Sequence, residues 1–174
     1  MTTASKITMV RVVLIPVFMA LLLCGYSYAA FAVFVLASVT DFIDGYVARH
    51  YHQVSNFGKF VDPLADKLLV ISCMVIFTEW GRFPSWATMI VLAREFAVSG
   101  LRMLAAEGGL VIAAGWSGKI KTSCTMIGLC AMLVIRNVPL LDRIVMIVIV
   151  VTTLCSGVEY FVKNWGVFGF SKKS

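Results

Sequence analysis

Long apolar runs, separated by short polar or glycine-containing stretches, dominate the hydropathy pattern of this chain. A membrane-spanning helix needs about 20 predominantly apolar residues, whereas the strands of an outer-membrane barrel would alternate apolar and polar residues. The unbroken runs therefore predict an all-α integral membrane protein, a bundle of six transmembrane helices. The predicted spans are approximately Met9–Cys24, Ala29–Ala48, Phe60–Thr78, Trp86–Glu107, Lys119–Ile135 and Ile144–Val162.

The composition supports a membrane protein. Hydrophobic residues make up 60% of the chain and charged residues 14%, whereas a soluble domain is nearer half apolar and a quarter charged. The five cysteines form no CxxC pair, which predicts neither a disulfide framework nor a zinc site. A basic start before an apolar run also fits a secretory signal peptide, but the second long apolar segment that follows at once favours a first span. We expect a single domain over residues 1–174.

The placement of positive charge predicts the topology, because lysine and arginine mark the cytoplasmic side of a membrane protein. With both termini cytoplasmic, only Arg82, Arg136 and Arg143 of the 15 lysines and arginines fall on the outer side. Arg94 lies deep in its span, so its contribution to this bias is weak. We expect a multi-pass protein of the cell inner (cytoplasmic) membrane, with no nucleic-acid partner.

Four aspartates interrupt the apolar pattern around the connection between the second and third predicted spans: Asp41, Asp44, Asp62 and Asp66. Their i,i+3 and i,i+4 spacings put each pair on one helix face, and the antiparallel spans bring all four to a similar depth. Carboxylates gathered there would repel one another without cations. Oxygen-only ligands suit Mg²⁺ or Mn²⁺, and two such ions about 4 Å apart can clamp a phosphoryl group. The pattern predicts two divalent cations.

Small residues next to these acids leave room for a ligand. Gly45 and Ala48 remove side-chain bulk from the turn beside Asp44, so a nucleotide could lie close to the helix, and Arg49 could then bind its phosphate. The alternative is that Gly45 and Ala48 serve close helix packing. His50 and His52 could ligate a metal, but contact with lipid headgroups is the preferred interpretation because four acids already suffice.

The residues Asp-x2-Asp-Gly-x2-Ala-Arg-x8-Gly-x3-Asp-x3-Asp fit a known signature at every fixed position, and in this the chain resembles the CDP-alcohol phosphatidyltransferases. The resemblance implies six transmembrane helices, a site facing the cytoplasm, two divalent ions and often a homodimer. It implies that Asp66 is the general base and shares in metal binding, and that the other metal ligands are Asp41, Asp44 and Asp62. It places around the CDP moiety Gly45, Ala48, Arg49 and Gly58.

Four cations further along the chain predict the nature of the acceptor. Arg94 and Arg102 lie on the fourth predicted span, and Lys119 and Lys121 at the start of the fifth. Together they suit an acceptor that itself carries a phosphate. Two alternatives stay open: Arg94 could form a salt bridge to an acid such as Glu95 or an aspartate, and the lysines could be positive-inside anchors.

The stretches around these cations also resemble the bacterial phosphatidylglycerophosphate synthases, as do residues 8–16, 60–68 and 156–161. That resemblance implies CDP-diacylglycerol and sn-glycerol 3-phosphate as substrates. Sister enzymes acting on inositol phosphate, phosphatidylglycerol or serine are the main alternative. A divalent-cation transporter is more remote, because its acids should lie near mid-membrane, whereas these lie at the inner end.

Overall fold

The computed structural model describes residues 3–51, 56–107 and 115–165, and its side chains over residues 9–40, 67–106 and 115–165. These residues form six helices and no strand. The helices are α1 (Thr3–Leu23), α2 (Ser27–Tyr51), α3 (Asn56–Glu79), α4 (Ser85–Glu107), α5 (Trp116–Val134) and α6 (Pro139–Lys163).

Each predicted span corresponds to one of these helices, so the all-helical architecture is confirmed, but two predicted connections are too long. The basic loop expected from Arg49 to Lys59 is mostly helical, because α2 continues to Tyr51 and α3 begins at Asn56. The outer turn expected up to Arg143 is also shorter. Pro139 opens α6 and Asp142 lies in its first turn, and both residue types are favourable at a helix N-terminus.

Two helices end at glycines with a positive φ. Gly25 (φ 85°) follows α1 and Gly81 (φ 70°) follows α3, and the left-handed conformation after a helix costs glycine little. After α1, the amide of Tyr26 donates to the carbonyl of Leu21 at 2.9 Å. The closure at Gly25 leaves a short connection, and α2 packs along α1.

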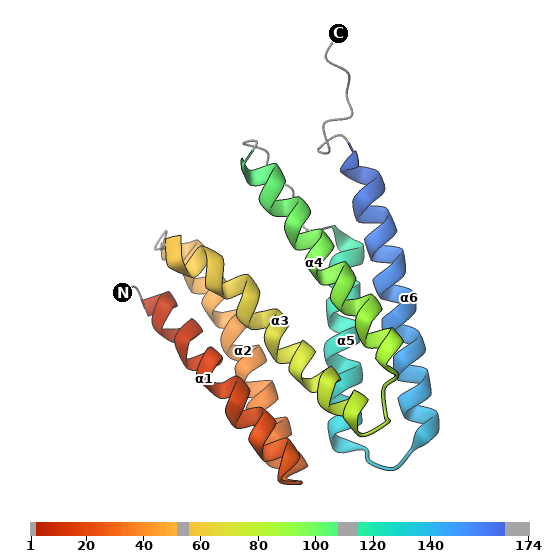
Figure 1. The fold of residues 1–174 in the computed structure, drawn as a ribbon. Coiled ribbons are helices and arrows are strands. Elements are labelled where there is room, and N and C mark those ends of the chain that lie inside the picture. Colours follow the sequence, from red (N-terminus) through yellow and green to blue (C-terminus); the bar gives the residue numbers. More distant parts are fainter. Residues whose placement is uncertain (1–2, 52–55, 108–114, 166–174) are drawn as a thin grey trace. The chain divides into compact units, whose positions relative to one another are not determined.

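The chain forms two compact units. The first contains Met1–Trp80 and Cys130–Asn137, and in it α1 packs along both α2 and α3 (Figure 1). Phe18 and Phe34 are fully buried there, with ring centroids 5.5 Å apart. The single domain expected over residues 1–174 stays a prediction.

The second unit contains Gly81–Leu129 and Val138–Ser174, and in it α4 packs on α6. Helices α5 and α6 also approach closely, because a Cβ added to Gly128 would lie only 2.7 Å from Cγ1 of Val145. This unit holds all four cations that the sequence predicts to bind an acceptor phosphate.

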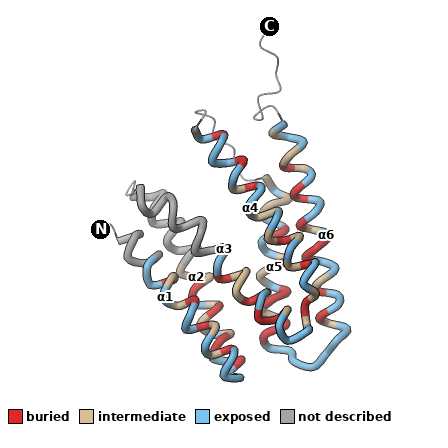
Figure 2. The backbone as a smooth tube through the Cα atoms, in the orientation of Figure 1, coloured by how far each residue is buried: buried red, intermediate tan, exposed pale blue. Residues whose placement is uncertain are grey.

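Buried and exposed positions alternate along α6 (Figure 2). Its buried positions include the polar residues Asp142, Thr153, Ser156 and Tyr160 beside the apolar Val145, Ile149 and Val150. The exposed face presents Ile144, Ile147, Val148, Val151, Leu154, Val158 and Val162. Among the described residues, α6 is the one helix that is both long and apolar enough to cross a bilayer, while Met9–Leu23 and Ser27–Thr40 are shorter apolar segments.

Hydroxyl groups on the helices bond to carbonyls of their own helix. Ser38 donates to the carbonyl of Phe34 at 2.7 Å, and Thr152 donates to that of Val148 at 2.7 Å. An apolar surrounding offers a hydroxyl no water, so a partner within the helix satisfies it. The same bond is made by Thr40, Ser72, Thr78, Ser99, Thr122 and Thr125.

Candidate active site

The aspartate signature lies on two consecutive helices. Asp41 and Asp44 are in the C-terminal half of α2, and Asp62 and Asp66 are in the N-terminal half of α3. Residues 52–55 connect these two halves, so the backbone carries all four acids near the joined ends of the two helices. Both pairs are helical, as their spacing predicted. Of the other signature residues, α2 carries Gly45, Ala48 and Arg49, and α3 carries Gly58.

The side chains of residues 41–66 are outside the part that the structure describes. The predicted metal ligands, the general base and the residues around CDP therefore stay predictions, and His52 lies outside the described residues altogether. Within the described side chains, no group of three or more histidine, cysteine, aspartate or glutamate residues is placed to hold a metal ion.

Two of the four predicted acceptor-binding cations meet at one carboxylate oxygen. Nη1 of Arg94 lies 3.0 Å from Oε1 of Glu95, and Nζ of Lys121 lies 2.6 Å from the same atom. These are charge-assisted hydrogen bonds, with side-chain exposures of 13% for Arg94, 15% for Glu95 and 5% for Lys121. We call Arg94, Glu95 and Lys121 the Glu95 cluster. The alternative that Arg94 forms a salt bridge to Glu95 is confirmed.

Two glycines give the Arg94 side chain its place between helices. A Cβ added to Gly157 of α6 would lie 3.3 Å from Cγ of Arg94, and one added to Gly118 of α5 would lie 3.8 Å from its Nη2. The Nε atom of Arg94 is buried and has no hydrogen-bond partner in the described part of the chain. Helices α4, α5 and α6 therefore fix the position of a guanidinium that retains an unused donor.

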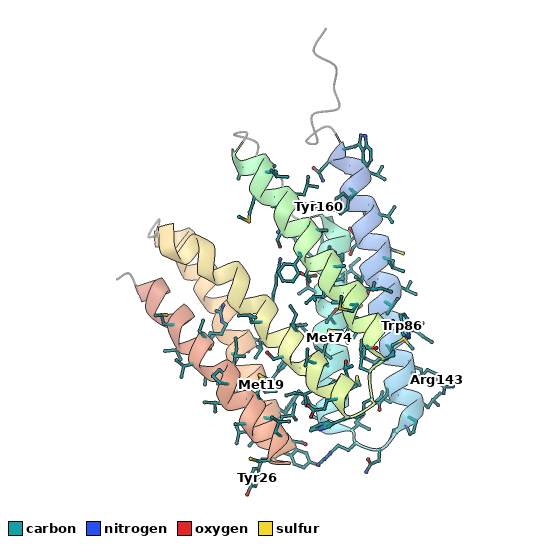
Figure 3. All side chains as sticks on the ribbon, viewed as in Figure 1. Met19, Tyr26, Met74, Trp86, Arg143 and Tyr160 are labelled. Carbon is teal, nitrogen blue, oxygen red and sulfur yellow. The ribbon has the colours of Figure 1, made fainter. Side chains whose placement is uncertain are left out.

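Arg102 is bound to a different residue, Tyr160 of α6 (labelled in Figure 3). Its Nε donates to the tyrosine hydroxyl at 3.0 Å, and its Cζ lies 5.4 Å from the centre of the tyrosine ring. The ring is 7% exposed and belongs to a small apolar cluster with Val98 and Leu101. Arg102 itself is exposed, so it lies outside the Glu95 cluster.

Lys119, the fourth predicted cation, is also outside that cluster. Its side chain is exposed, and its Nζ lies 5.0 Å from the ring centre of Trp116, a residue that is 78% exposed. A cation–π contact at such an exposed position is worth about 0.5–1 kcal/mol. The structure therefore brings together Arg94 and Lys121 and leaves Arg102 and Lys119 with aromatic partners.

Both arginines of α4 lie against α6. The Arg94 side chain passes Gly157, where an added Cβ would lie 3.3 Å from its Cγ, and Arg102 reaches the hydroxyl of Tyr160. Sequence reasoning gave no role to Gly157 or Tyr160. The sequence offered one signal for them, a glycine and a tyrosine hydroxyl within a helical segment that is otherwise largely apolar.

Comparison with known proteins places these features in context. The model of the CDP-alcohol phosphatidyltransferase family matches residues 1–155. The chain is 40% identical over 182 residues to the CDP-diacylglycerol–glycerol-3-phosphate 3-phosphatidyltransferase of Bacillus subtilis (strain 168), covering 92% of this chain and 94% of that protein.

Two further relatives have similar names. The enzyme of the same name from Escherichia coli (strain K12) is 41% identical over 139 residues, covering 74% of this chain and 75% of that protein. A probable phosphatidylglycerophosphate synthase of Mycobacterium tuberculosis (strain ATCC 25618 / H37Rv) is 36% identical over 165 residues, covering 90% of this chain and 78% of that protein.

Proposed function

The chain belongs to the CDP-alcohol phosphatidyltransferase family, and we propose that it is a CDP-diacylglycerol–glycerol-3-phosphate 3-phosphatidyltransferase. It transfers the phosphatidyl group of CDP-diacylglycerol to sn-glycerol 3-phosphate and releases phosphatidylglycerophosphate and CMP. The structural observation that carries this choice of acceptor is the Glu95 cluster. Its two cations, Arg94 and Lys121, are largely buried and face a single carboxylate, which suits an acceptor that brings its own phosphate.

The chemistry of the signature residues fits divalent cations. Asp41, Asp44, Asp62 and Asp66 offer carboxylate oxygens alone, the donors that Mg²⁺ and Mn²⁺ prefer, and they lie on the joined ends of α2 and α3. We assign these four residues as the ligands of two such ions. When bound, the ions would neutralise the diphosphate of the nucleotide and so assist departure of CMP.

The remaining signature residues bind the donor and move the proton. Gly45 and Ala48 leave the α2 surface open to the nucleotide, with Gly58 on α3 beside it, and Arg49 binds phosphate. Asp66 accepts the proton of the free 1-hydroxyl of sn-glycerol 3-phosphate. That oxygen forms a bond to the phosphorus bearing diacylglycerol, the bond from this phosphorus to the CMP oxygen breaks, and CMP leaves with the electron pair.

The cations of α4 and α5 hold the acceptor. A phosphate dianion can accept from Arg94 and Lys121 together, and the fork of a guanidinium matches two phosphate oxygens. Arg102, held by Tyr160 of α6, and the exposed Lys119 add further positive charge that attracts an anionic acceptor. Serine carries no phosphate, so these cations give a serine-specific enzyme no advantage.

The fold and location follow from the family and the helices. We propose that the six helices span the cell inner membrane with both termini in the cytoplasm, that the active site faces the cytoplasm and that the enzyme forms a homodimer. The apolar outer face of α6 supports the membrane placement.

The proposal is tested by following radiolabelled sn-glycerol 3-phosphate into lipid in membranes that contain the chain. We expect label in phosphatidylglycerophosphate that depends on added CDP-diacylglycerol and on Mg²⁺ or Mn²⁺. The matched control is Asp66→Asn, which keeps the size of the side chain and should abolish the product. Full turnover by this variant would refute the role of Asp66 as the base.

A further inference from the structure

Tyr160 places a single polar atom at the edge of a fixed apolar cluster. Its ring is 7% exposed and packs with Val98 and Leu101 of α4, and Phe161 packs against the same cluster. The backbone carbonyl of Tyr160 accepts from the side-chain amide of Asn164 at 2.7 Å and from its backbone amide at 3.2 Å. Packing and helix end together hold the ring, so the position of its hydroxyl is well defined.

The hydroxyl is used by Arg102. The Nε–H of Arg102 donates to it at 3.0 Å, and the guanidinium carbon lies 5.4 Å from the ring centre. Nε is one donor of the guanidinium fork, and the two terminal nitrogens carry the rest. No described residue hydrogen-bonds to those terminal nitrogens. Tyr160 therefore holds the Arg102 side chain through its Nε donor and leaves the donors on the two terminal nitrogens open to a ligand.

An exposed arginine without such a contact would have to be ordered by its ligand. Fixing a rotamer-rich side chain on binding costs conformational entropy, and a contact made beforehand lowers that cost.

We propose that Tyr160 is a positioning residue, which orients the terminal nitrogens of Arg102 toward the phosphate of the acceptor alcohol. This inference rests on the proposed function, in which Arg102 helps to hold that phosphate. Tyr160 acts through Arg102 and does not itself contact the reacting atoms. A purely structural role, in which the ring only fills space between α4 and α6, makes a different prediction.

The test varies sn-glycerol 3-phosphate at saturating CDP-diacylglycerol with the full chain purified in mixed micelles. Tyr160→Phe keeps the ring and its packing and removes only the hydroxyl. We expect the KM for sn-glycerol 3-phosphate to rise roughly three- to tenfold, the scale of one hydrogen bond of typical net strength. The kcat, the KM for CDP-diacylglycerol and the unfolding temperature should stay near the wild-type values.

The second arm is Arg102→Met, alone and combined with Tyr160→Phe. Alone, it should raise the same KM by more than Tyr160→Phe does, and the double variant should match it, because the hydroxyl then has no arginine to orient. If Arg102→Met leaves the KM unchanged, Arg102 is no part of the acceptor site, and both its proposed role and this inference are wrong. If Arg102→Met raises the KM but Tyr160→Phe does not, or if the two effects add, only the inference is wrong.

Discussion

Two ion clusters in the second compact unit of the chain are similarly buried but differ in their balance of charge. Arg82 and Asp142 form a double contact, with Nε to Oδ2 at 2.9 Å and Nη2 to Oδ1 at 2.7 Å. One cation there meets one carboxylate. In the Glu95 cluster, by contrast, two cations meet one carboxylate and share a single oxygen. For Arg94 and Lys121, Glu95 is the carboxylate partner that the described residues provide.

We interpret the Arg82–Asp142 pair as structural and propose that the Glu95 cluster binds the acceptor. A fork-to-fork pair satisfies both groups and ties the segment before α4 to the first turn of α6. Within the described part of the chain, two cations share one carboxylate oxygen, which leaves an excess of positive charge where unpaired charge is costly. We propose that an incoming phosphate offsets this excess and so stabilises the cluster. This contrast leads to four predictions.

The largest effect is expected when the Glu95 cluster is made to resemble the Arg82–Asp142 pair. Arg94→Met removes one cation and leaves Lys121 with Glu95, one charge of each sign. We expect kcat/KM for sn-glycerol 3-phosphate to fall roughly 10- to 100-fold, the value of a hydrogen bond between charged groups. Steady-state kinetics measures this, with CDP-diacylglycerol binding as the control. Unchanged kinetics for the acceptor would refute the contrast between the two clusters.

Breaking the structural pair should lower the stability of the protein and leave acceptor binding unchanged. Asp142→Asn removes the carboxylate that Arg82 contacts in two places, and loss of one partner of a buried pair costs about 3 kcal/mol. Thermal unfolding in detergent should therefore begin several degrees lower, while the KM for sn-glycerol 3-phosphate stays the same. A raised KM at normal stability would mean that this pair belongs to the acceptor site.

Removing the shared carboxylate should make the stability of the protein depend on a bound anion. Glu95→Gln keeps the shape of the side chain but leaves Arg94 and Lys121 without the charge that offsets their repulsion. We expect a lower unfolding temperature in the absence of anions. Added sn-glycerol 3-phosphate should raise it more than in the wild type, because the uncompensated cations should bind the phosphate more tightly and a tighter ligand stabilises the folded state more. Equal stabilisation of both proteins would argue against Glu95 as an internal counter-ion.

The smallest effect is expected from one methyl group beside Arg94. Gly157→Ala puts a Cβ 3.3 Å from Cγ of Arg94, so the arginine must shift slightly, and we expect a KM for the acceptor about two- to fivefold higher. Gly128→Ala is the matched control. Its Cβ would meet Val145 at 2.7 Å, so it should cost about 1–3 kcal/mol of stability and leave that KM alone. The reverse pattern would contradict the placement of Arg94.

The sequence predicted the features that depend on local patterns. The apolar runs predicted six helices because a membrane-spanning helix needs about 20 predominantly apolar residues. The boundaries at Arg49–Lys59 and Arg136–Arg143 were less accurate, because polar residues at a helix end resemble those in a loop. Pro139 and Asp142 favour a helix start, although their surroundings indicated a turn.

The candidate site was predictable in part, where charged residues stand out within an apolar helical segment. Arg94 and Lys121 do converge, and the neighbouring acid that was weighed as the partner of Arg94 turns out to bind both. The contact between Arg102 and Tyr160 could not be predicted, because it joins residues 58 positions apart. Spacing along α4 does not indicate which side chain α6 presents to it.

The central claim is that the surplus charge of the Glu95 cluster serves a phosphate-bearing acceptor, sn-glycerol 3-phosphate. The most direct measurement is CMP release from CDP-diacylglycerol by the purified full chain, with sn-glycerol 3-phosphate, inositol phosphate, phosphatidylglycerol or serine supplied in turn. We predict rapid release with sn-glycerol 3-phosphate and formation of phosphatidylglycerophosphate. Release with another of these acceptors, and none with sn-glycerol 3-phosphate, would contradict the claim.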